Sequence, residues 1–341
     1  MRAVFVRKFG VRPEVAAVAD PSVTGHGAVL RVAATGLCRS DWHGWQGHDA
    51  GIRLPYVPGH EMAGTIAALG RDVRGWSAGD RVTVPFVCAC GSCEQCRDGN
   101  QQVCLNQEQP GFSYWGSFAQ YVAIPQAEVN LVRLPDDLSF AGAASLGCRF
   151  ATAYRALRRV ARISAGEWVA VFGCGGVGLS AVMIAAASGA QVIAIDTSPA
   201  ALALAARHGA AQALPAGPGV AAAIRDLTGG GAHVSVDALG SAAVVAPALG
   251  CLRPRGRLVQ IGLLPGEISL DMAALIGREL QWLGSHGMAA ADYPEMLAMV
   301  SSGALRPQDL VTSVIGLADV PDALAAMSTA SSPGITVIEL G

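Results

Sequence analysis

Residues 38–43 bring together side chains that enzymes use for chemistry. Their order is Cys-Arg-Ser-Asp-Trp-His, so a thiol, a guanidinium, a hydroxyl, a carboxylate and an imidazole lie within one loop's length. Thiolates and imidazoles bind metal ions, and an imidazole also accepts and donates protons near neutral pH. A polar turn would have the same composition, so the meaning of the stretch depends on whether later residues complete a site.

Four later cysteines have the spacing of a metal site within a single loop. They follow the pattern C-x2-C-x2-C-x7-C and are Cys90, Cys93, Cys96 and Cys104. Four thiolates bind zinc tetrahedrally and leave no position open, which is the arrangement of a structural site. We therefore predict a structural zinc that holds a lobe at about residues 88–106, a segment without an apolar core of its own. Four free cysteines crowded into one loop are the alternative.

Cys38, His60 and Cys148 are candidates for a second metal site, although they are far apart in the sequence. Two thiolates and one imidazole would leave a fourth position open for water or an alcohol, as in catalytic zinc sites. No local spacing identifies these residues as ligands. From the residues alone, buried thiols and a hydrogen-bonded core histidine therefore remain alternatives.

The sequence G-C-G-G-V-G at residues 173–178 is typical of a dinucleotide-binding turn. An apolar strand is expected before it and an apolar helix after it, and the next predicted strand ends at Asp196, 23 residues after Gly173. In such a turn Gly173 bends the chain, Gly175 lets the backbone approach the pyrophosphate, and Gly178 lets the helix pack on the sheet. The residues predicted to contact the cofactor are Gly173, Gly175, Gly176, Val177, Gly178 and Asp196.

The residues around Asp196 favour NAD over NADP. The carboxylate is expected to accept hydrogen bonds from the ribose hydroxyls, and residues 197–201 contain no Arg or Lys. A 2′-phosphate would therefore meet a negative charge with no cation beside it. A glycine-rich surface turn with an exposed Asp is the alternative to a cofactor site.

The order of predicted elements indicates an α/β protein with two domains. Up to about residue 150 the chain reads as short strands between Gly- and Pro-rich turns, which predicts a β-rich, barrel-like unit. From residue 168 strands and helices alternate, which predicts a doubly wound parallel sheet. The predicted strands of this sheet are residues 168–172, 191–195, 234–237, 257–261 and 279–283. We expect domains at 1–150 and 151–285, with residues 286–341 returning to the first.

Composition excludes several classes of protein. The 341 residues are 52% hydrophobic and 15% charged with a formal net charge of −2, which argues against a disordered chain, a nucleic-acid-binding surface and a polybasic membrane patch. Residues 168–195 carry no charge, but their glycines predict strand, turn, helix and strand instead of a membrane span. The first residues lack the apolar segment of a signal peptide, and nine cysteines then indicate a reducing compartment, so we expect a cytoplasmic protein.

The motifs together resemble the zinc-dependent medium-chain alcohol dehydrogenases over almost the full length of the chain. The matching stretches are residues 36–41, 58–61, 79–82, the four-cysteine loop, 146–148 and 173–178. The resemblance implies a GroES-like catalytic domain and a Rossmann coenzyme domain, with the active site in the cleft between them. It also implies NAD, two zinc ions per subunit (one catalytic, one structural), and a homo-oligomer that is a dimer or a tetramer.

The resemblance assigns roles to residues around the catalytic zinc. By matching position, Cys38, His60 and Cys148 would bind the metal. Asp41 would orient His60, as carboxylates hydrogen-bonded to ligand histidines do. Glu61 would lie behind the metal as an occasional ligand.

The resemblance also implies a path for the substrate proton. Ser40 would hydrogen-bond the substrate oxygen and take its proton, and His43 would pass that proton to solvent. Zinc would stabilise the alkoxide, and hydride would then move to the nicotinamide. Arg39 would hold the cofactor pyrophosphate, and Thr152 would pack on the nicotinamide side.

The substrate is less clearly indicated than the reaction. Phe86 is implied to line the pocket, and Trp42 and Trp115 are candidates for further aromatic walls, with ordinary packing as the alternative. Polyol and threonine dehydrogenases of this superfamily usually have Glu where Cys148 stands. Cys148 therefore favours simple alcohols, aldehydes and ketones, with a polyol or other secondary alcohol as the alternative.

Two rival functions follow from the same fold. A zinc-free quinone reductase is disfavoured, because such relatives lack both cysteine sets. A catalytically silent cofactor-binding protein would be expected to have lost Ser40, His43 or a metal ligand, and all of these are present.

One departure from the family pattern gives a prediction. Relatives often have Arg after a glycine near the C-terminus, where it contacts the pyrophosphate, whereas here Ile335 follows Gly334. We expect somewhat weaker binding of NADH because one cation is missing. The check is the dissociation constant of NADH measured beside that of relatives with the Arg; an equal or tighter value would contradict the expectation.

Overall fold

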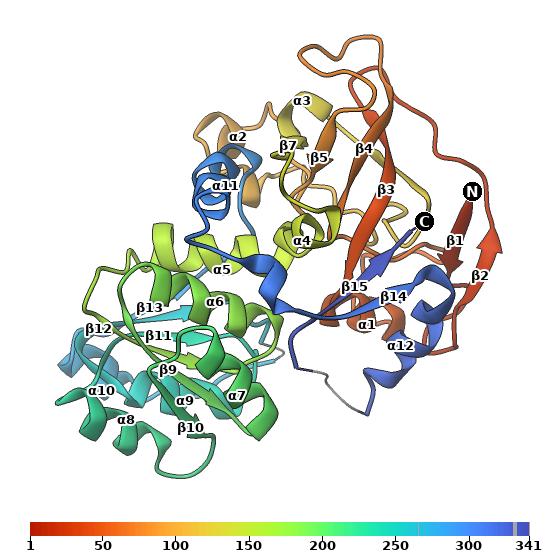
Figure 1. Ribbon diagram of the computed structural model, residues 1–341. Coiled ribbons are helices and arrows are strands. Elements are labelled where there is room, and N and C mark those ends of the chain that lie inside the picture. The colour runs from red at the N-terminus through yellow and green to blue at the C-terminus, as the bar shows by residue number, and fades with distance from the viewer. Residues whose placement is uncertain (265, 330–332, 341) are drawn as a thin grey trace. The chain divides into compact units, whose positions relative to one another are not determined.

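The computed structural model describes residues 1–264, 266–329 and 333–340, and the chain forms two compact units. The first unit comprises Met1–Ala151, Gly287–Gly303 and Pro307–Gly341, and the second comprises Thr152–His286 and Ala304–Arg306. Figure 1 shows the elements of both units with their labels.

The first unit is rich in β-structure, with short helices at its margins (Figure 1). Its strands are β1 (Arg2–Phe5), β2 (Glu14–Ala17), β3 (Ala28–Leu37), β4 (Met62–Leu69), β5 (Arg81–Thr83), β6 (Tyr121–Ile124), β7 (Val132–Arg133), β14 (Val311–Gly316) and β15 (Ile335–Glu339). Its helices are α1 (Arg39–Gln46), α2 (Glu94–Arg97), α3 (Ala127–Asn130), α4 (Phe140–Ala144), α11 (Tyr293–Ser301) and α12 (Val320–Ala326). A π-helical turn, Leu146–Phe150, follows α4.

Strand β3 organises the first unit. It lies inside a sheet with the order β14-β15-β3-β4-β5-β7, and it also pairs with β6. β3 and β4 are antiparallel, and Thr35 near the end of β3 pairs with Met62 at the start of β4. The residue that follows β3, Cys38, and the residues that precede β4, His60 and Glu61, therefore lie at the same edge of the sheet.

The second unit is a doubly wound α/β domain. Its strands are β8 (Trp168–Phe172), β9 (Gln191–Asp196), β10 (Gln212–Pro215), β11 (Ala232–Asp237), β12 (Leu252–Gln260) and β13 (Gln281–Gly284). Its helices are α5 (Ala151–Arg155, which begins at the boundary), α6 (Gly176–Ala187), α7 (Pro199–Arg207), α8 (Val220–Thr228), α9 (Ala242–Gly250) and α10 (Met272–Gly277), and a π-helical turn spans Ala156–Val160.

All five strand pairs of the second unit are parallel, in the order β10-β9-β8-β11-β12-β13. This is the strand order of a Rossmann domain, in which the cofactor site lies at the carboxyl end of the first strand, β8. Val169, Ala170 and Val171 of β8 are fully buried, as expected for a central parallel strand covered on both faces. The predicted fold class, a GroES-like β-rich domain plus a Rossmann domain, is confirmed.

The uncharged run at residues 168–195 forms β8, α6 and most of β9, as predicted. Among the described residues, no helix is both long enough and apolar enough to cross a membrane. The strand predicted at residues 279–283 starts later, at Gln281. Glu279 has a φ of 47°, and this left-handed conformation is incompatible with a strand.

Residues 38–43 do not form a turn; they begin helix α1. A polar turn was one of the alternatives for this stretch, which glycines flank. The helix ends at Gly47, whose φ of 80° is left-handed. The start of the helix is stabilised by Asp41, whose side chain accepts a hydrogen bond from the backbone N–H of Cys38.

Candidate active site

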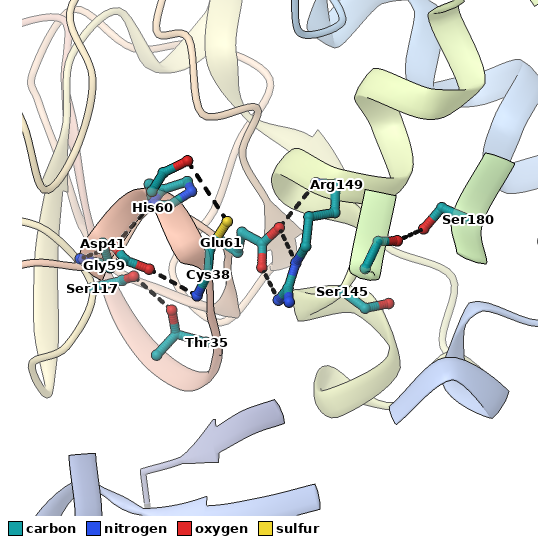
Figure 2. Close-up of polar contacts among 12 residues, drawn as sticks. Thr35, Cys38, Asp41, Gly59, His60, Glu61, Ser117, Ser145, Arg149 and Ser180 are labelled. Atoms are coloured by element: carbon teal, nitrogen blue, oxygen red, sulfur yellow. Dashed lines mark hydrogen bonds and ion pairs between the residues drawn. The ribbon is translucent and has the colours of Figure 1, made fainter. Parts of the chain in front are cut away.

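Asp41 joins the start of helix α1 to the segment that precedes β4. Its Oδ2 accepts from the Cys38 N–H at 3.0 Å, and its Oδ1 accepts from the Gly59 N–H at 3.0 Å. Oδ1 also lies 2.9 Å from Nδ1 of His60. Figure 2 shows this carboxylate between the two segments. Because the carboxylate accepts from Nδ1–H, the His60 tautomer leaves the Nε2 lone pair free to bind a metal.

Four possible metal ligands lie together in the first unit. The donor atoms of Cys38, His60, Glu61 and Cys148 are all within 4.8 Å of one another. His60 is only 1% exposed, yet its Nε2 has no hydrogen-bond partner among the described residues. A buried nitrogen of this kind is costly unless something binds it, and a zinc ion held by two thiolates and this imidazole would do so.

Electrostatics favour the thiolate form of Cys38 and the thiol form of Cys148, because the hydrogen bond to Cys38, followed by burial, raises the pKa of Cys148 well above its ordinary value. The pKa of Cys38 is held well below its ordinary value, first by a hydrogen bond from Cys148 and then, against the cost of burial, by His60 and by the charge of Arg149. Only the thiolate is a good metal ligand, so Cys38 already favours the form that binds a cation, whereas Cys148 would release its proton when a cation binds.

Glu61 is buried behind these donors and is paired with Arg149. Its Oε1 accepts from the backbone N–H of Arg149 at 2.9 Å and from the Nε–H at 3.0 Å. Its Oε2 accepts from an Nη2–H of the same guanidinium (Figure 2). Burial raises the pKa of Glu61 and the Arg149 charge lowers it, so the ion pair offsets the cost of a carboxylate in the interior.

The π-helical turn Leu146–Phe150 presents both Cys148 and Arg149 to this cluster. A π turn is wider than an α turn, so neighbouring side chains diverge less around the axis, and such turns are frequent at functional sites. The buried Tyr293 of α11 places its Oη 3.3 Å from the carbonyl oxygen of Gly147, to which it donates. This contact fixes the turn from a segment 146 residues away.

The four cysteines of the lobe also converge. Four of their sulfur–sulfur distances are 3.4, 3.5, 3.7 and 4.0 Å, and no pair is a disulfide. Zinc–sulfur bonds of about 2.3 Å in a tetrahedron would separate the sulfurs by about 3.8 Å, so the set fits zinc. A hydrogen bond from the Ser92 N–H is the largest effect that lowers the pKa of Cys90, to about 5. Cys88 stays outside the set, with its Sγ 3.4 Å from Tyr114 Oη.

The glycine turn of the second unit has an open position where a pyrophosphate is expected. Gly173 has a φ of 90°, and a Cβ on Gly178 would lie 1.6 Å from the carbonyl oxygen of Gly173. A Cβ on Gly175 would meet nothing within 4 Å. Asp196 accepts from the Cys174 N–H at 2.6 Å and from the Ser198 N–H at 2.8 Å, which fixes its carboxylate at the end of β9.

Comparison with known proteins decides the family. Residues 25–136 match the model of the alcohol dehydrogenase GroES-like domain, and residues 176–302 match that of the zinc-binding dehydrogenases. An alcohol dehydrogenase of Geobacillus stearothermophilus is 33% identical over 94% of this chain and 95% of its own length. The NAD-dependent alcohol dehydrogenase of Sulfurisphaera tokodaii is 30% identical over 99% of both chains. The chain belongs to the zinc-dependent medium-chain alcohol dehydrogenase family.

Solved structures agree with this assignment. The alcohol dehydrogenase TADH from Thermus sp. ATN1 has a TM-score of 0.91 and 30% identity, and each chain covers 100% of the other. NAD and zinc are therefore the cofactors expected for this medium-chain alcohol dehydrogenase.

The residues predicted to relay the proton, Ser40 and His43, lie on α1. Ser40 Oγ is 3.8 Å from Cys38 Sγ. The exposed His43 lies on the same helix, with its Nδ1 2.9 Å from Nδ1 of His48, so one ring must donate to the other. Arg39, predicted to hold the pyrophosphate, instead donates to the carbonyl oxygen of Met327. It would have to leave that partner in order to reach a phosphate.

Only some of the predicted pocket residues lie beside the candidate metal ligands. Phe86 has its ring centroid 6.2 Å from that of His60, and Phe112 is closer, at 5.4 Å. Trp115 packs edge-on against Phe5 at 5.6 Å. Trp42 donates from Nε1 to Ser328 Oγ at 2.9 Å, beside His43.

In the second unit, Thr152, predicted to pack on the nicotinamide, is 6% exposed. Its Oγ1 is buried and has no hydrogen-bond partner in the part of the chain that the structure describes. A bound group could therefore use this hydroxyl.

Sequence reasoning missed Arg149, Phe112 and the partnership of His48 with His43. An Arg directly after a predicted ligand was a usable signal for Arg149, because Arg is rarely buried without a partner. Phe112 and His48 carry no such signal. The positions of these two side chains depend on how loops that are distant in sequence pack together.

The glycine turn gives a prediction with a matched control. Gly178→Ala should lower Tm by roughly 5 °C or more, because the new methyl group would overlap a backbone carbonyl. Gly175→Ala should leave Tm almost unchanged and raise the dissociation constant of NADH about tenfold, because its methyl group would occupy free space needed by the cofactor. Thermal denaturation and NADH fluorescence titration measure the two effects. Unchanged NADH binding by Gly175→Ala would show that the pyrophosphate does not approach this turn.

Proposed function

We propose that this protein is an NAD-dependent zinc alcohol dehydrogenase that interconverts alcohols with aldehydes or ketones. The observation that carries the proposal is the cluster of two thiols and one imidazole. Cys38 and His60 are buried in it, and Nε2 of His60 has no partner among the described residues. Three such ligands leave one position for the substrate oxygen. The similar alcohol dehydrogenases across almost the whole chain support the same reaction.

We assign two zinc ions to each subunit. Cys38, His60 and Cys148 would hold the catalytic ion. The four cysteines of the lobe would hold a structural ion in a closed site. Apart from Ala89 and Val129, the small core cluster of the lobe consists of these cysteines, so the ion would supply most of its cohesion. When bound, the catalytic zinc polarises the substrate oxygen and NAD accepts the hydride.

The protein side chains bind, orient and move the proton. Asp41 keeps Nδ1 of His60 protonated and so keeps Nε2 available to the metal. Ser40 is placed to accept the substrate proton, since its hydroxyl lies beside a metal thiolate. His43 receives the proton and, being exposed, releases it to solvent.

Most of the residues proposed to bind the cofactor lie in the second unit. The turn at residues 173–178 would hold the pyrophosphate at the start of α6, and Asp196 would bind the ribose. Arg39 and Thr152 keep their proposed contacts with the pyrophosphate and the nicotinamide. With no Arg or Lys at residues 197–201, we propose NAD as the preferred cofactor.

Substrate class, assembly and location complete the proposal. Cys148 in the third ligand position favours simple alcohols over polyols, and the rings of Phe86 and Phe112 beside His60 favour an apolar substrate. We propose a cytoplasmic homodimer or homotetramer that binds neither nucleic acid nor membranes.

Metal analysis and a spectrophotometric assay test this function. We expect two zinc ions per subunit and alcohol-dependent formation of NADH. Cys38→Ser should retain one zinc and lower kcat more than about 100-fold, because an inner ligand matters more than the residues that support it. Cys93→Ser should also retain one zinc but mainly lower Tm, because it opens the lobe. A wild-type protein with one zinc, or with no turnover across primary, secondary and benzylic alcohols, would overturn the proposal.

The relay predicts a specific pH dependence. Desolvation first, and then the charges of His48 and Arg39, lower the pKa of His43, while the Cys38 thiolate opposes them. A base must be neutral, so kcat/KM for alcohol oxidation should fall only as the pH drops below the ordinary range of histidine. His48→Gln removes one charge that lowers this pKa and should move the acid limb to higher pH.

The control for this experiment is His26→Gln, which changes an exposed histidine elsewhere in the first unit. It should leave the profile unchanged. An acid limb that stays in place, or moves to lower pH, in His48→Gln would show that His43 is not the titrating base.

A further inference from the structure

We propose that Arg149 is a positioning residue that holds the Glu61 carboxylate off the catalytic metal and so keeps the fourth metal position open for substrate. The inference rests on the proposed zinc site. Arg149 takes no part in the proposed proton path.

Glu61 is close enough to become a metal ligand. One of its carboxylate oxygens lies within 4.8 Å of the donor atoms of Cys38, His60 and Cys148. Carboxylates bind zinc readily, and zinc with four protein ligands in a tetrahedron has no position left for a substrate. An unrestrained Glu61 would therefore compete with the alcohol for the same place.

Arg149 restrains both oxygens of that carboxylate. Oε1 accepts from the backbone N–H and from Nε–H, and Oε2 accepts from Nη2–H. A planar guanidinium engages the two oxygens at once, which fixes the orientation of the carboxylate as well as its charge. Both side chains are buried, with exposures of 0% for Glu61 and 8% for Arg149, so water cannot take the place of either partner.

The backbone at Gly36 packs closely against the Glu61–Arg149 ion pair. A Cβ on Gly36 would lie 2.1 Å from Glu61 Oε2 and 2.7 Å from Arg149 Nη2. The N–H of Gly36 also donates to the carbonyl oxygen of Glu61 at 2.7 Å. Strand β3 therefore packs directly on the ion pair, and it does so just before it delivers Cys38 to the metal site.

If the Glu61–Arg149 pair had only a structural role, a different result would be expected from removing Arg149. If Arg149 only neutralised a buried charge, its loss would lower stability without changing access to the metal. If it holds Glu61 away, its loss would lower the affinity of the metal for an added ligand, and removal of the Glu61 carboxylate would restore that affinity.

The test uses Co²⁺ in place of zinc and azide as the added ligand. Absorption of Co²⁺ between thiolate ligands reports the metal environment directly, and the closed four-cysteine site cannot bind azide, so the azide-dependent change comes from the catalytic site alone. In Arg149→Met we expect an altered spectrum before azide is added and an azide affinity about tenfold weaker than in the wild type. In Arg149→Lys, which keeps the charge but loses the two-pronged contact, we expect a smaller loss in the same direction.

The matched control is the double variant Glu61→Gln/Arg149→Met. It replaces a buried ion pair by neutral groups, which proteins tolerate better than a lone buried charge. Its spectrum and azide affinity should return close to those of the wild type.

Two outcomes would overturn the proposal: an azide affinity in folded Arg149→Met or Arg149→Lys equal to that of the wild type, or a double variant as weak as the single one. Arg149→Lys and the double variant keep the test decisive should Arg149→Met not fold. A wild-type protein whose Co²⁺ spectrum does not respond to azide would instead contradict the proposed catalytic metal site.

Discussion

The Asp41 carboxylate is the contact on which the rest of the site depends. Its side chain is fully buried and accepts from two backbone N–H groups, those of Cys38 and Gly59, and from the His60 ring. One group thereby starts a helix, fixes the loop before β4 and selects the histidine tautomer. A buried carboxylate costs free energy unless its oxygens accept hydrogen bonds. The hydrogen bond that orients His60 is therefore also one of those that stabilise Asp41 in the interior.

Strand pairing supplies the second constraint. The register that opposes Thr35 to Met62 brings the end of β3 and the start of β4 together, and a slip of one residue would turn the following side chains to the other face. The third segment reaches the cluster through the π turn after α4, which Tyr293 holds from α11. The candidate metal ligands are held in place because the three segments that carry them, which are distant in sequence, are each fixed by further contacts.

These constraints explain which parts of the fold and of the candidate site could be predicted from the sequence. The cysteine lobe and the glycine turn depend on local spacing, so the pattern of residues was enough to name them. The alternation of strands and helices predicted the Rossmann sheet because its central strands, β8, β9 and β11, are apolar and buried. Cys38, His60 and Cys148 needed the family resemblance, since only long-range pairing brings them together. Arg149 was missed because no sequence pattern reveals a π turn, and without that turn the direction of its side chain is unknown.

The charges around the proposed metal show why the Glu61–Arg149 pair matters. Two thiolates balance the charge of Zn²⁺, so a site with these ligands and a neutral imidazole is electrically neutral and can stabilise the negative charge that develops on an alcohol oxygen. A carboxylate bound as a fourth ligand would add a negative charge to the metal and oppose that development. Arg149 offsets the charge of Glu61 at close range and engages both of its oxygens, which in the proposal above keeps them from binding the metal. The chain can therefore bury an acidic residue beside its metal site without changing the charge that the substrate meets.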